Sequence, residues 1–152
     1  MITVSDGVAA GVREDLSGEA LERLLEDKGF VVERALVPDE RPEIEAAISA
    51  AAKRARLVVT TGGTGFGPRD VTPEATAAVL EREAPGLVQL MVAKGLESTP
   101  MAALTRARAG AIGSCLVVNL PGSPRGATES LEAIVGVIPH ALKLLAGDTS
   151  HH

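Results

Sequence analysis

Four glycines lie within six residues, Gly62 to Gly67, directly after the apolar run Leu57 to Val59. Backbone N–H groups that lack a neighbouring Cβ can approach an anion closely, so this segment is able to bind phosphate oxygens. The same glycines could instead form only a tight turn, and for a glycine cluster taken alone both interpretations carry similar weight. The residues that follow favour a binding site. The Arg69 guanidinium can bind phosphate oxygens in pairs, and the Asp70 carboxylate is a hard oxygen ligand for Mg²⁺.

The glycine segment matches neither of two common phosphate-binding motifs. Counted from Gly62, the spacing of a Walker A loop reaches Gly67, but Pro68 and Arg69 stand where Lys and Ser or Thr are required. Counted from Gly63, the dinucleotide-binding fingerprint places Pro68 at its third glycine. A purely local role also remains open for Asp70, as part of an Asx-type turn ahead of the next helix.

Similar polar corners follow three other predicted strands. Asp39 and Glu40 follow one, Ser5 and Asp6 follow another, and residues 119–123 follow a third. Each has a simple alternative, since Asp, Asn, Gly and Pro favour turns, and a carboxylate ahead of a helix gains ~0.3–1 kcal/mol from the helix dipole. Because neighbouring parallel strands end at one crevice, four such corners together predict a site there, with two carboxylates suited to Mg²⁺ and a nucleotide.

The apolar pattern places these corners on an α/β fold. Predicted strands at residues 1–5, 30–37, 57–61 and 115–120 alternate with helices over 18–29, 42–55, 72–83 and 87–98 and a last helix from Ser123 with a kink at Pro139. Ser17 is the predicted N-cap of the first helix, with Leu16 and Leu21 as a hydrophobic staple. The alternation predicts a three-layer α/β/α sandwich around a mostly parallel, mixed sheet, with residues 1–148 as one domain and 149–152 as a tail.

Composition excludes several classes of function. The net charge of -5 and the two aromatic residues, Phe30 and Phe66, disfavour nucleic-acid binding. The sequence contains no apolar run long enough for a membrane span. The lone Cys115 is expected to be a buried core residue in a protein of the reducing cytosol, and we therefore predict a cytoplasmic location. His140 is expected to pack or lie on the surface, and His151–His152 resemble a tag remnant.

The sequence closely resembles one known family. The segment "VVTTGGTGFGPRDVTPEAT", together with "LVPDE", "REAPG", "LTRARAG" and "LVVNLPGSP", is similar to the signature of the molybdopterin adenylyltransferases, the MogA/MoaB-like proteins of molybdenum-cofactor biosynthesis. The resemblance covers nearly the whole chain. It implies a molybdopterin-binding-like fold, a homotrimer, and transfer of AMP from MgATP to the terminal phosphate of molybdopterin with release of pyrophosphate. It also implies a molybdate-insertion enzyme as a partner.

The resemblance also implies roles for particular residues. The aspartates of the "PDE" and "PRD" motifs correspond to Asp39 and Asp70, which are expected to be the catalytic acids and to hold Mg²⁺. The remaining matched positions are expected to bind the substrates, ATP and molybdopterin; they are Ser5, Asp6, Gly62, Gly63, Thr64, Gly65, Arg69, Thr105, Asn119, Pro121, Gly122 and Ser123.

Two departures from the family pattern leave other functions open. Thr105 stands where the family often has Ser, and residues 111–115 lack a basic residue that the family frequently carries. A molybdopterin carrier or scaffold without turnover is therefore the alternative to an enzyme, and a small interaction protein with a purely structural glycine turn is a third hypothesis. The complete "PRDVTP" segment favours the enzyme, because non-catalytic relatives tend to lose it.

Overall fold

A computed structural model describes residues 1–150; His151–His152, interpreted above as a tag remnant, lie outside the described residues. Six strands form one sheet in the order β2-β1-β3-β6-β5-β4. The strands are β1 (Ile2–Val4), β2 (Ala35–Val37), β3 (Leu57–Thr61), β4 (Arg82–Glu83), β5 (Ala109–Ile112) and β6 (Cys115–Leu120). The first four in spatial order run parallel, β5 runs antiparallel to β6, and β4 runs antiparallel to β5. This arrangement confirms the predicted α/β fold with a mostly parallel, mixed sheet.

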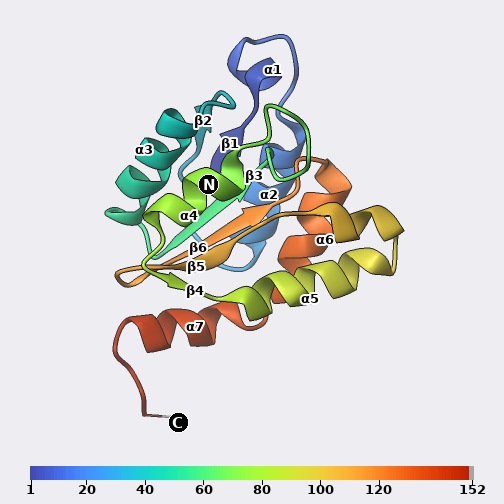
Figure 1. The fold of residues 1–152 in the computed structure, drawn as a ribbon. Coiled ribbons are helices and arrows are strands. Elements are labelled where there is room, and N and C mark those ends of the chain that lie inside the picture. Colours follow the sequence, from blue (N-terminus) through green and yellow to red (C-terminus); the bar gives the residue numbers. More distant parts are fainter. Residues whose placement is uncertain (151–152) are drawn as a thin grey trace.

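Helices cover both faces of the sheet (Figure 1). Helices α3 and α4 pack on one face, and α2, α5, α6 and α7 on the other. The helices are α1 (Asp6–Ala9), α2 (Leu16–Asp27), α3 (Arg41–Ala52), α4 (Thr72–Val79), α5 (Pro85–Leu96), the 3-10 helix η1 (Pro100–Leu104), α6 (Pro124–Ile134) and α7 (Ile138–Leu145). Three layers therefore result, as the strand–helix alternation predicts.

The two faces of β6 explain why this strand is apolar at successive positions. Leu116 and Val118 point toward α2, α5, α6 and α7, whereas Cys115 and Val117 point toward α3 and α4. All four side chains are at most 4 % exposed. A strand covered on both faces has no polar side, so alternation is absent from its sequence. Cys115 is buried as expected, and burial raises the pKa of its thiol.

The N-terminal predictions need two corrections. The N-cap of α2 is Asp15, whose Oδ1 accepts from Gly18 N–H at 3.0 Å, and Leu16 is 53 % exposed and forms no staple. Ser17 instead donates its hydroxyl hydrogen to the Gly122 carbonyl at 3.0 Å. Strand β2 is also shorter than the predicted 30–37, because its partner β1 has only three residues with which to pair.

The later elements also differ from prediction. Helix α4 ends at Val79, since Leu80 turns extended and the chain continues into edge strand β4. Strand β5, a hairpin partner of β6 across Gly113-Ser114, was not predicted. The expected kinked last helix is two helices separated at residues 135–137, and Pro139 lies in the first turn of α7, where it breaks no hydrogen bond.

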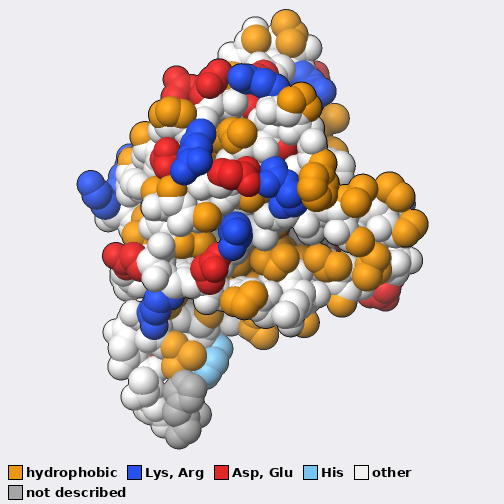
Figure 2. Space-filling model, in the orientation of Figure 1, with side chains coloured by type: hydrophobic (Ala, Val, Ile, Leu, Met, Phe, Trp, Pro, Cys, Tyr) orange, Lys and Arg blue, Asp and Glu red, His pale blue; other side chains and the backbone are white. Residues whose placement is uncertain are grey.

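Charged and apolar side chains separate on the surface. Figure 2 shows hydrophobic side chains gathered over the projecting end of α5 and the segment after it, while side chains of both charges are interspersed above α4. Leu96, Met101 and Leu104, at 48 %, 63 % and 52 % exposure, belong to this apolar end. His140 lies on the surface of α7. Within residues 1–150, no helix is long and apolar enough to cross a membrane.

Candidate functional site

Four parallel strands end side by side at one edge of the sheet. Ser5 follows β1, Asp39 follows β2 after one residue, Gly62 follows β3 and Pro121 follows β6. From β1 the chain adds β2 toward one edge of the sheet, and from β3 it adds β6 toward the other edge. The strand order therefore reverses between β1 and β3. Ligand sites in open α/β sheets form at such a reversal, beyond the carboxyl ends of the strands. The predicted corners therefore do meet at one edge.

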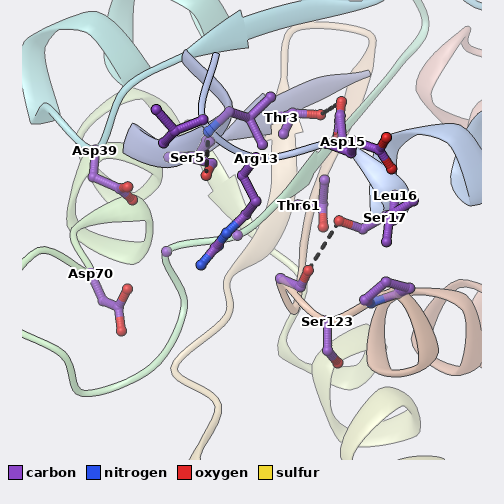
Figure 3. Close-up of a pocket in the computed structure, with 18 residues that line it drawn as sticks. Thr3, Ser5, Arg13, Asp15, Leu16, Ser17, Asp39, Thr61, Asp70 and Ser123 are labelled. Carbon is purple, nitrogen blue, oxygen red and sulfur yellow. Dashed lines mark hydrogen bonds between the residues drawn. The ribbon is translucent and has the colours of Figure 1, made fainter. Parts of the chain in front are cut away.

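A hollow of about 730 Å³, termed here the larger hollow, opens at this reversal (Figure 3). The hollow is lined by residues of β1 and β3, by the segment around α1 and by the start of α2. Its polar and glycine lining residues include Thr3, Ser5, Arg13, Glu14, Asp15, Ser17, Asp39, Thr61, Gly62, Gly63, Asp70, Gly122 and Ser123. Asp39 and Asp70 lie on the same side of this hollow in the close-up, with Ser17 and Ser123 opposite them.

A second hollow of about 410 Å³, the smaller hollow, adjoins the first. The two share a wall made of Gly63, Asp70, Gly122 and Ser123. The smaller hollow is otherwise lined by apolar residues of α5 and η1, such as Met91 and Met101, and by Thr64, Gly65, Thr105 and Pro121. Two adjacent spaces that meet at a glycine-rich wall can hold two ligands with their reacting groups at that wall.

The glycine loop owes its shape to backbone conformations that favour glycine. Gly62 and Gly63 have φ values of 102° and 69°. The Gly62 N–H donates to the Leu120 carbonyl at 3.1 Å, and the Thr72 hydroxyl donates to the Gly62 carbonyl at 2.9 Å. The loop is thereby tied both to the neighbouring strand end and to the start of α4.

Arg106 fixes the far side of the loop, a role that sequence analysis did not assign to it. Its guanidinium donates to the carbonyls of Gly65 at 2.7 Å and Asp70 at 2.8 Å, and it pairs with Glu74. It also lies over the Phe66 ring, 5.4 Å from the centroid. No local signal could have revealed this clamp, because Arg106 lies 36 residues beyond Asp70 in the chain.

Asp6 and Asp39 hold each other in place. The Asp6 N–H donates to Asp39 Oδ2, and the Asp39 N–H donates to Asp6 Oδ1, both at 2.9 Å. Arg69 binds Asp6 through Nε at 3.0 Å and Glu40 through Nη2 at 2.9 Å. The Arg69 hydrogen bond is the main cause that lowers the pKa of Asp6. The Arg69 guanidinium is thus paired with carboxylates, and neither Arg69 nor Asp6 lines the larger hollow described above.

The two predicted acids each keep one oxygen available. Asp39 Oδ2 accepts from Asp6 and Asp70 Oδ2 accepts from Gly67 N–H at 2.9 Å, while within residues 1–150 no hydrogen bond reaches the Oδ1 atom of either. Desolvation raises the pKa of Asp39, and the charges of Asp6 and Asp70 raise it further. A cation near Asp39 would relieve this cost. Asp70 does not form the Asx-type turn considered above, because the Thr72 N–H donates to the Gly63 carbonyl and not to the Asp70 carboxylate.

The raised pKa of Asp39 predicts a stability gain on neutralisation. The folded protein binds the Asp39 proton more tightly than the unfolded chain, so its stability falls as pH rises from the ordinary pKa of 3.8 through the raised one. Asp39→Asn keeps the acceptor for Asp6 and cannot ionise. We expect this variant to resist urea more than the wild type at neutral pH, with the gain shrinking as pH falls and vanishing below 3.8.

Urea unfolding at a series of pH values, monitored by circular dichroism, measures this difference. Asp27→Asn removes the same charge at the exposed end of α2, so a gain that it shows equally would be an effect of net charge alone. A variant less stable than wild type at neutral pH, or a gain that persists well below the ordinary pKa of 3.8, would contradict the prediction.

Asn119 lies behind the wall of the site. Its side chain is 0 % exposed, its amide donates to the hydroxyls of Thr60 and Thr76 at 2.9 Å, and its carbonyl oxygen accepts from Arg108 N–H at 3.0 Å. Thr76 in turn donates to the Thr72 carbonyl at 2.8 Å. This network links β6 and β3 to the start of α4. Asn119 therefore holds the elements that carry the site and has no surface in either hollow.

The donor set suits a cation held partly by a substrate. Among the described residues, no group of three or more His, Cys, Asp or Glu side chains could hold a metal ion. Mg²⁺ typically binds through one or two carboxylates together with substrate phosphates and water, so a complete protein cage is not required. Asp39 and Asp70 bring two carboxylates to the lining of the larger hollow.

The fold and the site together define an α/β protein whose acidic, glycine-rich pocket lies at the point where strand order reverses. The chain belongs to the family described as "Probable molybdopterin binding domain", whose model matches residues 1–140. The family resemblance seen in the sequence motifs is thereby confirmed.

Individual relatives are similar to this chain over nearly its full length. The chain is 39 % identical over 153 residues to the molybdopterin adenylyltransferase of Helicobacter pylori J99, covering 97 % of this chain and 87 % of that protein. It is 38 % identical to the molybdenum cofactor synthesis protein cinnamon of Drosophila melanogaster, of which it spans only 26 %. The crystal structure of the molybdopterin biosynthesis enzyme MoaB from Thermus thermophilus superposes with a TM-score of 0.89 at 50 % identity, covering 96 % of this chain and 94 % of that one.

Proposed function

We propose that this protein is a molybdopterin adenylyltransferase of molybdenum-cofactor biosynthesis, which transfers AMP from MgATP to the terminal phosphate of molybdopterin. One observation supports this most strongly. This chain has a molybdopterin adenylyltransferase among its relatives. It also places two carboxylates and a glycine loop around two adjacent hollows that share a wall. An adenylyl transfer needs two phosphorylated substrates whose reacting groups meet, and these hollows offer that arrangement.

The proposed reaction joins a phosphate oxygen of molybdopterin to the α-phosphorus of ATP. The bond between the α-phosphorus and the bridging oxygen breaks, and pyrophosphate leaves with that electron pair. The attacking phosphate is already ionised, so no general base is needed, which fits a site without a His or Cys nucleophile among its described lining residues. The chain's own task is positioning, through the glycine backbone, the Ser123 hydroxyl and the two aspartates.

Mg²⁺ is the proposed cofactor, with Asp39 and Asp70 as its protein ligands. When bound, it would neutralise charge on the phosphate oxygens and on the departing pyrophosphate. The raised pKa of Asp39 supports this assignment, because a nearby cation would favour the ionised form that burial and the neighbouring carboxylates disfavour. Asp6 and Arg69 are proposed to hold Asp39 in position, as their mutual contacts indicate.

The direct test incubates purified protein with molybdopterin, ATP and Mg²⁺ and follows pyrophosphate release together with the adenylylated pterin. We expect both products in equal amounts and neither in the presence of EDTA. Tight binding of molybdopterin without either product would instead favour the carrier hypothesis. The Thr105 side chain, which lines the smaller hollow, would then be the first position to revert to Ser.

We also propose a homotrimer, which the family resemblance implies and which the exposed Leu90 and Leu96 side chains of α5, outside both hollows, support as a surface that a second copy would cover. Light scattering should give a mass three times that of the 15.6 kDa chain. A monomer mass at all concentrations tested would contradict this. A molybdate-insertion enzyme is the proposed recipient of the product, and the cytoplasm is the proposed location of this protein.

A further inference from the structure

Arg13 lies between α1 and α2 and lines the larger hollow. In the close-up its side chain extends into the space between Asp39 and Asp70 on one side and Ser17 and Ser123 on the other (Figure 3). Within residues 1–150, no hydrogen bond or ion pair engages its guanidinium. An arginine that points into a pocket without a protein partner has all its donors available to a ligand.

The other arginines near the site have protein partners. Arg69 binds Asp6 and Glu40, Arg34 binds Asp15 and Glu22, and Arg106 binds Glu74. Among the described residues that line the larger hollow, Arg13 is the single basic side chain, and it shares that lining with the acidic residues Glu14, Asp15, Asp39 and Asp70. These carboxylates would repel a polyanionic ligand, so a cationic side chain in the hollow favours its binding in addition to the proposed Mg²⁺.

The Arg13 stem rests against the backbone of α1 at Gly7. A Cβ at Gly7 would lie 3.4 Å from Arg13 Cβ and 3.5 Å from Nε, which is ordinary contact distance. The Arg13 stem therefore packs alongside α1 at Gly7, where an alanine side chain would also fit. A guanidinium whose stem is supported in this way loses less conformational entropy on binding than one that extends freely into solvent.

We propose that Arg13 binds the phosphate groups of the substrate that occupies the larger hollow. This inference rests on the proposed function, and Arg13 supplies a phosphate contact that Arg69, which is paired with Asp6 and Glu40, does not offer. Two sources share this chemistry, the triphosphate of ATP and the phosphate of molybdopterin. Arg13 binds either one through paired, charge-assisted hydrogen bonds.

The test compares Arg13→Ala and Arg13→Lys with Arg23→Ala, which removes the same charge from an exposed position of α2 that lines neither hollow. Steady-state assays give KM for ATP and for molybdopterin separately, and calorimetric titration gives the Kd of inorganic pyrophosphate. We expect Arg13→Ala to weaken pyrophosphate binding and to raise one of the two KM values by ~10–100-fold. Arg13→Lys should recover part of the loss, since it keeps the charge without the paired donors, and Arg23→Ala should match the wild type.

The outcomes separate this inference from the proposed function. A rise confined to KM for ATP assigns the contact to the nucleotide, and one confined to KM for molybdopterin assigns it to the pterin. Unchanged KM values and pyrophosphate affinity in an active Arg13→Ala variant would overturn the inference and leave the function standing. Loss of pyrophosphate binding in a protein without turnover would support the inference while the function fails. A wild-type protein that binds none of the three ligands would overturn both.

Discussion

Replacing Asp70 by Asn should reduce adenylylation by at least ~10²–10³-fold, the usual effect of removing a group that stabilises charge in the transition state. The side chain would keep an acceptor for Gly67 N–H, a contact of 2.9 Å in the wild type, so the glycine loop should retain its shape. What the variant loses is the negative charge on the wall between the two hollows. We therefore expect kcat to fall while the calorimetric Kd of molybdopterin and the urea midpoint stay close to wild type.

The dependence on Mg²⁺ tests the assigned role of Asp70 directly. If its carboxylate binds the cation, the Mg²⁺ concentration for half-maximal activity should rise in Asp70→Asn, whereas a purely structural role would leave it unchanged. Glu26→Gln makes the same chemical change at an exposed position of α2 and should behave as wild type. Turnover at the wild-type rate in Asp70→Asn would refute the assignment.

The sequence was sufficient to predict that the polar corners meet at one edge of the sheet, because its strongest signals were local. Strand β3 has the predicted boundaries, 57–61, and so has β6, 115–120, since each begins with an apolar run and ends just before a glycine or a proline. Once these strands are parallel, the rule that ligands bind beyond their carboxyl ends brings Asp39, Asp70 and the glycine loop to one edge. The family motifs then added which residues to expect there.

The features that were missed depend on contacts between distant parts of the chain. Arg69 was expected to face phosphate, but Asp6 and Glu40, from segments 63 and 29 residues away, bind it. Arg106 clamps the glycine loop from beyond η1, and Arg13, to which the sequence assigned no role, reaches the hollow from the loop between α1 and α2. Strand β5 had a usable signal, since Gly113-Ser114 between two apolar runs is typical of a hairpin, but its small residues have low strand propensity.

Gly62→Ala should disrupt the site more severely than any substitution of an exposed lining residue. Gly62 has a φ of 102°, which L side chains rarely adopt, and a Cβ there would lie well inside contact distance of the Val4 carbonyl oxygen. That oxygen belongs to the end of β1, so it cannot move without disturbing the sheet. Gly122 packs against the same residue, with its own Cβ position 3.3 Å from Gly62 Cα. We expect a loss of ~2–4 kcal/mol in the free energy of unfolding, from backbone strain and steric overlap together.

Because Gly62 joins β1, β3 and the wall shared by the two hollows, the same change should also lower activity in whatever fraction remains folded. Urea unfolding and turnover at low temperature measure the two effects separately. Gly86→Ala is the matched control: nothing lies within 4 Å of the Cβ it would add at the start of α5, so its stability should stay within ~1 kcal/mol of wild type. Equal stability of Gly62→Ala and Gly86→Ala would contradict this prediction. It would mean that the contacts of Arg106 and Thr72, and not the close approach of β1, determine the shape of the glycine loop.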